Sequence, residues 1–277
     1  MPAWDVAVIG AGPAGLLAGI AAGRAGARAV VLEKRERPGR KLALTGGGRC
    51  NFGNTLEPGE FVERFGDRNA RRLGRALALF PGGMLRALLA RRGVEARLER
   101  GIRLYTASGK AEDVVDALAA ELAESGAALQ LSRPVARIER LDQGFLLRTQ
   151  DRGDLAATAL VLATGGLSYP ETGSTGDGFG WALELGHQAT PLRPGLIGLE
   201  CLEPWPGSLA GLVLPDVAAT LLPPAGGRPL ARERAELLFT HTGISGPAVL
   251  DLSLVLSRSG LETGRLEIGR ASCRERV

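Results

Sequence analysis

A doubly wound α/β fold is predicted by the N-terminal part of the chain. An apolar run at residues 6–9 ends in the pattern G-x-G-x-x-G at residues 10–15, and an Ala- and Leu-rich segment follows. A second apolar run, residues 29–32, ends in Glu33. Strand, glycine turn, helix, strand and acid in this order form the first β-α-β unit of a dinucleotide-binding sheet. The continuous apolar run 159–163 predicts a further buried strand.

Each glycine of the turn has its own physical reason. Gly10 permits the tight turn, Gly12 lets the backbone approach a pyrophosphate, and Gly15 lets the helix pack closely on the strand. The helix N-terminus offers free N–H groups and partial positive charge to phosphates. Glu33 stands where a carboxylate would hold a ribose 2′-OH. The cofactor-binding residues predicted in this unit are Gly10, Gly12, Pro13, Ala14, Gly15, Glu33 and Lys34.

Composition excludes several other classes of protein. The 277 residues are 45% hydrophobic and carry a net charge of +4, with no basic block interleaved with aromatic residues. We therefore expect no nucleic-acid partner. No uninterrupted apolar run approaches the roughly 20 residues of a membrane span, and no signal peptide precedes the first strand, so we expect a cytoplasmic protein without membrane association. The three cysteines are far apart and form no C-x-x-C pair, which disfavours disulfides, metal sites and a redox dithiol.

The rest of the chain alternates helical and strand patterns. We predict helices over 69–92, broken at 81–83, and over 112–124, and strands at 98–105, 128–131, 135–140 and 145–149. After Pro191 and Pro194 the pattern changes to β segments separated by prolines, at 195–201, 212–222 and 235–240. The predicted domain boundary lies near residue 193.

Two glycine-rich loops are candidates for contact with a cofactor. Ala163-Thr164-Gly165-Gly166 follows a buried strand, where neighbouring parallel strands converge on one crevice, although an ordinary strand-end turn has the same composition. Residues 41–51 contain Gly46, Gly47 and Gly48 in succession, which suggests a loop wrapped against something flat or phosphorylated. Arg49 and Asn51 would supply directed donors there. A flexible surface turn is the alternative.

Few residues qualify for acid–base or ligand roles elsewhere. Asp177, in a polar glycine loop, would bind a sugar hydroxyl or only cap the helix that follows. His241 lies in an unusually polar, glycine-rich loop and is the catalytic candidate. His187 has the position of a helix C-terminal residue. Cys50 is more typical of a buried filler than of a nucleophile. With no triad, metal cluster or P-loop lysine in the sequence, a cofactor must supply the difficult chemistry.

Four blocks together resemble a known bacterial family. They are VAVIGAGPAG at 6–15, GRKLALTGGGRCN at 39–51, ATGGLSYPETGSTGDG at 163–178 and FTHTGISGPAVL at 239–250. They are similar to NAD(P)/FAD-dependent oxidoreductases of the aminoacetone oxidase type. The resemblance covers nearly everything before residue 267. It implies FAD as the tightly held cofactor, on a glutathione-reductase-like FAD-binding domain interrupted by an inserted, mostly β second domain.

The resemblance also assigns residues to parts of FAD. It implies that the glycines of residues 10–15 cradle the pyrophosphate and that Glu33 binds the adenosine ribose. It implies that Val135 touches the adenine region through its backbone. The remaining residues that the resemblance and the motifs place at the cofactor are Lys41, Gly46, Gly47, Gly48, Arg49, Cys50, Asn51, Ala163, Thr164, Gly165, Gly166 and Asp177.

The domains expected from the resemblance are an FAD-binding domain over 1–193, lacking its return segment, and a partial β-rich domain over 194–266. Residues 267–277 have no apolar period and resemble the translation of a sequencing-library adapter, so they are expected to be a non-native tail. Members of the family continue past this point with a segment that closes over the flavin. For the chain as given, weak or no FAD retention is expected.

The function implied is transfer of hydride between NAD(P)H, or a small organic substrate, and the flavin, including reduction of activated C=C bonds. One alternative is a flavin amine oxidase that passes electrons to O2. An alternative of another class is a non-catalytic flavin-binding protein or an FAD-dependent RNA-modifying protein. The absence of a basic patch with aromatic residues argues against the RNA version.

Overall fold

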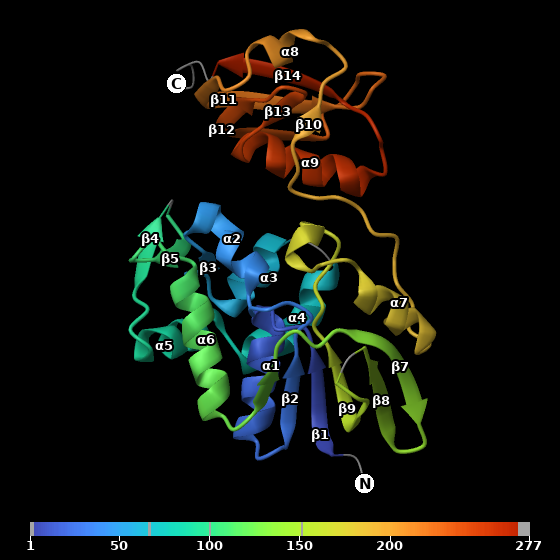
Figure 1. Cartoon of the computed structure of the whole chain (residues 1–277). Coiled ribbons are helices and arrows are strands. Elements are labelled where there is room, and N and C mark those ends of the chain that lie inside the picture. Colours follow the sequence, from blue (N-terminus) through green and yellow to red (C-terminus); the bar gives the residue numbers. More distant parts are fainter. Residues whose placement is uncertain (1–2, 66–67, 100, 151, 271–277) are drawn as a thin grey trace. The chain divides into compact units, whose positions relative to one another are not determined.

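The structure, a computed structural model, describes residues 3–65, 68–99, 101–150 and 152–270. The chain divides into two compact units, Met1–Ala189 and Thr190–Val277. Each unit has its own sheet and its own hydrophobic core, and each is described by itself (Figure 1).

The first unit is built on a six-stranded sheet with the order β6-β2-β1-β9-β8-β7. Its strands are β1 (Trp4–Ile9), β2 (Ala29–Leu32), β6 (Ala128–Gln130), β7 (Val135–Leu141), β8 (Gly144–Thr149) and β9 (Leu155–Leu162). β1, β2, β6 and β9 are parallel, and β7 and β8 form an antiparallel hairpin. Ile9 pairs with Leu32 on one side and with Leu162 on the other. The carboxyl ends of β1, β2 and β9 therefore lie level, which prepares one edge of the sheet for a site.

Helices cover both faces of this sheet, as the predicted fold requires. On one face, α1 (Pro13–Arg24) and α6 (Glu112–Glu124) share a core with β1 and β2 that includes the fully buried Leu16, Val31 and Leu118. On the other face, Trp181 of α7 (Asp177–Glu184) packs in a cluster with residues of β1, β2, β8 and β9. The predicted helix 112–124 is confirmed with the same bounds, because its apolar residues repeat at helical spacing and Gly126 follows its end.

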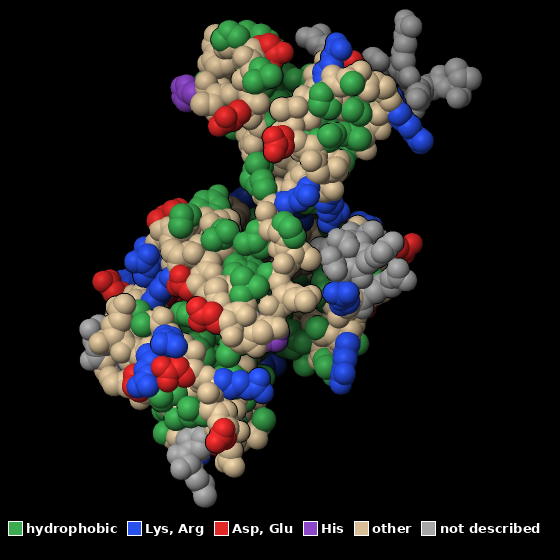
Figure 2. Space-filling model, turned by 90° about the vertical axis from the view of Figure 1, so that its right-hand side faces the viewer, with side chains coloured by type: hydrophobic (Ala, Val, Ile, Leu, Met, Phe, Trp, Pro, Cys, Tyr) green, Lys and Arg blue, Asp and Glu red, His purple; other side chains and the backbone are tan. Residues whose placement is uncertain are grey.

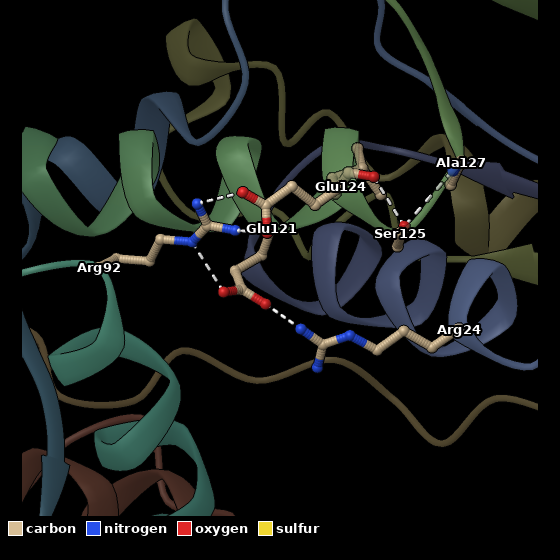
Figure 3. A network of polar contacts seen from close by, with 7 residues as sticks. Arg24, Arg92, Glu121, Glu124, Ser125 and Ala127 are labelled. Atoms are coloured by element: carbon tan, nitrogen blue, oxygen red, sulfur yellow. Dashed lines mark hydrogen bonds and ion pairs between the residues drawn. The ribbon is translucent and has the colours of Figure 1, made fainter.

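A buried carboxylate ties three helices of this unit together. Glu121 of α6 is only 3% exposed and pairs with Arg24, at the end of α1, and with Arg92, just after α5 (Gly82–Arg91) (Figure 3). Arg92 also pairs with Glu124 one turn further along α6. These hydrogen bonds raise the pKa of Arg92 and lower the pKa of Glu124. Because a buried charge is costly without partners, both arginines are needed to keep Glu121 in this position.

A smaller layer completes the unit. Its helices are α2 (Arg40–Gly48), α3 (Pro58–Phe65), α4 (Arg68–Leu79) and α5, and its three-stranded sheet has the order β3 (Asn51–Asn54), β5 (Arg103–Thr106) and β4 (Ala96–Glu99). The predicted single strand 98–105 is wrong: two antiparallel strands take its place, with Gly101 at φ +80° between them. A break between two helices is confirmed, but it lies at residues 80–81, because Gly82 and Gly83 already belong to α5.

Among the described residues, Arg72–Arg91 is the stretch that is long and apolar enough to cross a membrane. Length and composition alone are weak grounds for a span. The stretch is also divided between α4, which ends at Leu79, and α5, which begins at Gly82.

The second unit is a five-stranded antiparallel sheet with the order β10-β13-β12-β11-β14, covered by a helix. Its elements are β10 (Leu199–Glu200), α8 (Trp205–Ser208), β11 (Val213–Leu222), β12 (Ala231–Phe239), β13 (Gly243–Ser245), α9 (Pro247–Ser259) and β14 (Arg265–Arg270). The strand expected at 195–201 shrinks to β10. Residues 267–270, the first part of the expected non-native tail, pair with β11 as the end of β14, and residues 271–277 lie outside the described part of the chain.

Candidate functional site

A cavity of about 500 Å³ opens at the level carboxyl ends of β1, β2 and β9 in the first unit. Its walls come from the β1–α1 turn, the end of β2, the start of α2, the β6–β7 connection and the loop after β9. In a doubly wound sheet this edge is where ligands bind. Of the predicted cofactor residues, those in the lining are Gly10, Gly12, Pro13, Ala14, Glu33, Lys34, Lys41, Val135, Ala163, Thr164, Gly165 and Asp177.

The three glycines of the β1–α1 turn have different surroundings. Gly10 has φ +101°, and a Cβ there would lie 2.5 Å from the carbonyl oxygen of Ala163. A Cβ on Gly15 would lie 1.8 Å from the carbonyl oxygen of Gly10. A Cβ on Gly12 would meet nothing within 4 Å. Gly10 and Gly15 are thus required by the fold itself, whereas Gly12 leaves space beside the first turn of α1 for a ligand.

The lining of the cavity carries an excess of positive charge. Lys34, Arg37, Arg40, Lys41 and Arg133 face it, against the two carboxylates Glu33 and Asp177. The Nε of Arg133 is buried and has no hydrogen-bond partner among the described residues. Together with the N-terminus of α1, these cations make the cavity suitable for an anion such as a pyrophosphate.

Glu33 connects the ends of the two central strands. One carboxylate oxygen, Oε2, accepts a hydrogen bond of 2.9 Å from the backbone N–H of Ala11 in the glycine turn. The other oxygen, Oε1, accepts one of 2.9 Å from the N–H of Arg35. Each oxygen keeps a further lone pair for a ligand hydroxyl. The carboxylate therefore fixes the turn and also stands in the cavity wall.

Two lysines hold the loop after β9 against the cavity. Lys34 Nζ donates to Asp177 Oδ2 at 2.7 Å and to Thr175 Oγ1 at 2.6 Å. Lys41 Nζ donates to Ser168 Oγ at 3.2 Å. Burial raises the pKa of Asp177, but the bonds from Lys34 and Thr175 outweigh it and leave the pKa below its usual value. The ion pair makes Asp177 a partner of Lys34 and a part of the cavity wall.

The glycine run at 46–48 is the largest local surprise. It was expected to be a loop wrapped against a ligand; its backbone does turn at the end of α2, where Thr45, Gly46 and Gly47 leave helical geometry, but the turn is not part of the cavity lining. Arg49 stacks on the ring of Tyr105 at 4.8 Å and pairs with Glu99 at 3.2 Å. Cys50 is fully buried, and burial raises the pKa of its thiol although Thr45 lowers it by a hydrogen bond. Gly46–Asn51, like Gly15 and Gly166, does not line the cavity.

The catalytic candidate belongs to the second unit. His241 is exposed in the turn between β12 and β13 of the second unit and is not part of the cavity lining. The sequence did not single out the cavity residues Arg37 and Arg40, which stand beside and within the block at 39–51, or Arg133, which comes from a distant segment without a motif. The position of Arg133, three residues after β6 and close to the carboxyl ends of the strands, is the signal that could have identified it.

The comparison with protein families is decisive for the fold. The family described as the HI0933-like protein Rossmann domain matches residues 4–260. The chain belongs to this family. A solved structure, the open conformation of a flavocytochrome c3 fumarate reductase, has a TM-score of 0.57 and 20% identity over 77% of this chain and 47% of that protein. The predicted α/β fold, a Rossmann-type domain accompanied by a β-rich unit, is thereby confirmed.

Two curated relatives of this chain have different substrates in their names. The ribosomal RNA dihydrouridine synthase of Escherichia coli (strain K12) is 34% identical over 91% of this chain and 61% of its own length. The 3-dehydro-bile acid delta(4,6)-reductase of Clostridium scindens is 30% identical over 94% of this chain and 62% of its own length. The chain therefore spans about three fifths of the curated relatives that it matches.

The E. coli relative corrects one prediction. Nucleic acid was excluded as a partner because no basic block interleaved with aromatic residues is present, and a relative whose name specifies ribosomal RNA overturns that exclusion. The physical reason is that a search for contiguous basic blocks misses arginines spaced along helices.

The residues of the cavity fit FAD. The open space beside Gly12, the cationic lining and the buried, unpartnered Nε of Arg133 suit a diphosphate, and Glu33 has lone pairs free for a ribose. The structure therefore offers a cradle for the diphosphate of a dinucleotide at the edge of the sheet where Rossmann-type folds bind such ligands.

Proposed function

We propose that the protein is an FAD-dependent reductase that saturates a C=C bond conjugated to a carbonyl group. The observation that carries the proposal is the cavity at the ends of β1, β2 and β9, with its open glycine turn and five cationic side chains against two carboxylates. Support for the reaction type comes from the relatives. A dihydrouridine synthase and a delta(4,6)-reductase act on different molecules, but both names describe saturation of a C=C bond.

In this proposal the residues of the chain bind and orient the cofactor. Gly12, the first turn of α1 and Arg133 would hold the pyrophosphate of FAD, and Glu33 would hold the adenosine ribose. Lys34 and Lys41 keep the loop after β9 closed against the cavity. When bound, FAD supplies the chemistry of accepting a hydride from a reduced nicotinamide and passing it on. The net reaction consumes NAD(P)H, one proton and the alkene, and yields NAD(P)⁺ and the saturated product.

The test uses the full-length gene product under anaerobic conditions. We expect the protein to carry FAD, its absorbance near 450 nm to be bleached by NADH or NADPH, and the colour to return on addition of a 3-oxo-4-ene steroid or protein-free ribosomal RNA. Mass spectrometry should then find that the added steroid, or one nucleotide of the added RNA, is heavier by about 2 Da, the mass of two hydrogen atoms. Absence of bound flavin would refute the proposal. So would bleaching by an amine with recovery only under O2, which is the result expected of an amine oxidase.

A further inference from the structure

One stretch of the first unit has a charge pattern found nowhere else in the chain. Residues 68–94 contain seven arginines, at positions 68, 71, 72, 75, 86, 91 and 92, and no aspartate, glutamate or lysine. They form α4 and α5, joined by Phe80 and Pro81. At 1.5 Å per residue the two helices together extend over at most about 33 Å, the reach of several nucleotides.

Four of these arginines are exposed and have no carboxylate partner. Arg72, Arg75, Arg86 and Arg91 are exposed, and no ion pair or side-chain hydrogen bond joins them to the described part of the chain. Arg92 differs because Glu121 and Glu124 neutralise it. Some exposed arginines elsewhere pair with acids, as Arg148 does with Glu139, and Figure 2 shows such blue and red neighbours on the lower unit.

Apolar side chains are exposed between these arginines. Leu73 is 42% exposed, Leu79 70%, Phe80 37% and Met84 50%. An exposed ring between cationic side chains is what a protein uses to stack an unpaired base while its arginines contact the phosphates. A surface of this composition would also suit an anionic membrane.

We propose that Arg72, Arg75, Arg86 and Arg91, with Phe80, form a surface that binds the phosphate backbone of single-stranded RNA and presents the RNA to the reductase. The inference rests on the proposed function, since it names the class of substrate. Charge complementarity supports the proposal. The four arginines have no ion-pair partner among the described residues, the sequence 68–94 contains no acidic residue, and RNA is a polyanion. RNA fits better than a membrane because the apolar stretch is broken between α4 and α5 and carries arginines on both sides of the break. The E. coli relative, whose name includes ribosomal RNA, points the same way.

The test compares two variants of the full-length protein with equal loss of charge. In the surface variant, Arg72, Arg75, Arg86 and Arg91 are changed to Gln; in the control, Arg137, Arg140, Arg148 and Arg152, which are exposed on and beside the β7–β8 hairpin, are changed to Gln. Binding to protein-free E. coli ribosomal RNA is measured between 50 and 200 mM salt. We expect the surface variant to bind at least about tenfold more weakly and its salt slope to fall by about 3, since each lost contact removes about 0.7 for single strands.

Several outcomes would overturn the inference. Equal loss in both variants would show that only net charge matters, and unchanged binding by the surface variant would exclude this surface. Loss of binding to vesicles of 30% phosphatidylglycerol, with RNA binding intact, would assign the surface to membranes. FAD content and bleaching by NAD(P)H are measured in parallel on wild type and both variants. A wild type that binds RNA through this surface but lacks flavin would refute the proposed function and leave the RNA surface standing.

Discussion

Two of the glycine-rich turns, the β1–α1 turn and the turn that ends α2, contain glycine for different reasons. In the β1–α1 turn, Gly10 and Gly15 have backbone atoms of the protein within 2.5 Å and 1.8 Å of the position of a Cβ. In the turn that ends α2, a Cβ on Gly47 or Gly48 would meet nothing within 4 Å, but φ is +66° and +82°. The first turn needs glycine for space and the second for backbone conformation. A substitution therefore separates the two kinds of requirement.

The largest effect is expected at Gly15. Changing Gly15→Val places atoms where the carbonyl of Gly10 lies, so α1 must move away from β1 and the central core opens. We expect a loss of more than about 4 kcal/mol and mostly insoluble protein. Soluble yield and urea unfolding check this. A soluble Gly15→Val protein with wild-type stability would contradict the close packing of the turn.

A smaller effect is expected at Gly10. Changing Gly10→Ala forces φ +101° on a residue with a Cβ and brings that Cβ to 2.5 Å from the Ala163 carbonyl oxygen. We expect about 1–3 kcal/mol of destabilisation from the strained backbone alone. The Ala163–Gly166 loop should shift as well, so FAD affinity should fall together with the melting temperature. Lowered stability with unchanged FAD affinity would show that this loop does not contact the cofactor.

In the second turn the effect should be milder. Gly47→Ala meets no atom, so its cost is that of a left-handed residue, about 1–2 kcal/mol. Gly47→Asn should recover part of this loss, because Asn tolerates the left-handed region better than Ala. Thermal unfolding of the two variants measures the difference. Equal loss in both would indicate a steric rather than a conformational requirement.

How far the sequence predicts these features depends on how local their causes are. The β1–α1 turn and the helix over 112–124 follow from neighbouring residues alone. The hairpin of β4 and β5 was missed because a turn at Gly101 interrupts an otherwise continuous strand pattern. Arg37, Arg40 and Arg133 reach one cavity from segments about 100 residues apart, a meeting that periodicity does not encode. The arginine surface was missed because its residues are spaced along two helices.

The smallest effect is expected at the Lys34–Asp177 pair, which is partly exposed. Changing Lys34→Met should speed FAD dissociation by about threefold, in line with the roughly 0.2–1 kcal/mol of such pairs, and Lys110→Met is the matched control. Because the pKa of Asp177 is lowered in the fold, the pair is intact above the ordinary Asp pKa and is lost as pH falls through the lowered value. Stopped-flow measurement of FAD dissociation checks the effect of the substitution and its dependence on pH. An equal effect of Lys110→Met would show that the Lys34–Asp177 pair does not help to retain FAD.

We propose that the space beside Gly12 holds the pyrophosphate of FAD. Gly12 has φ −73°, which any residue adopts, and a Cβ there meets no protein atom. The direct test is fluorescence titration of FAD into the full-length apoprotein of wild type and Gly12→Ala. For Gly12→Ala we expect an unchanged melting temperature of the apoprotein and an FAD Kd at least about tenfold higher. Unchanged FAD affinity in Gly12→Ala would contradict the proposal.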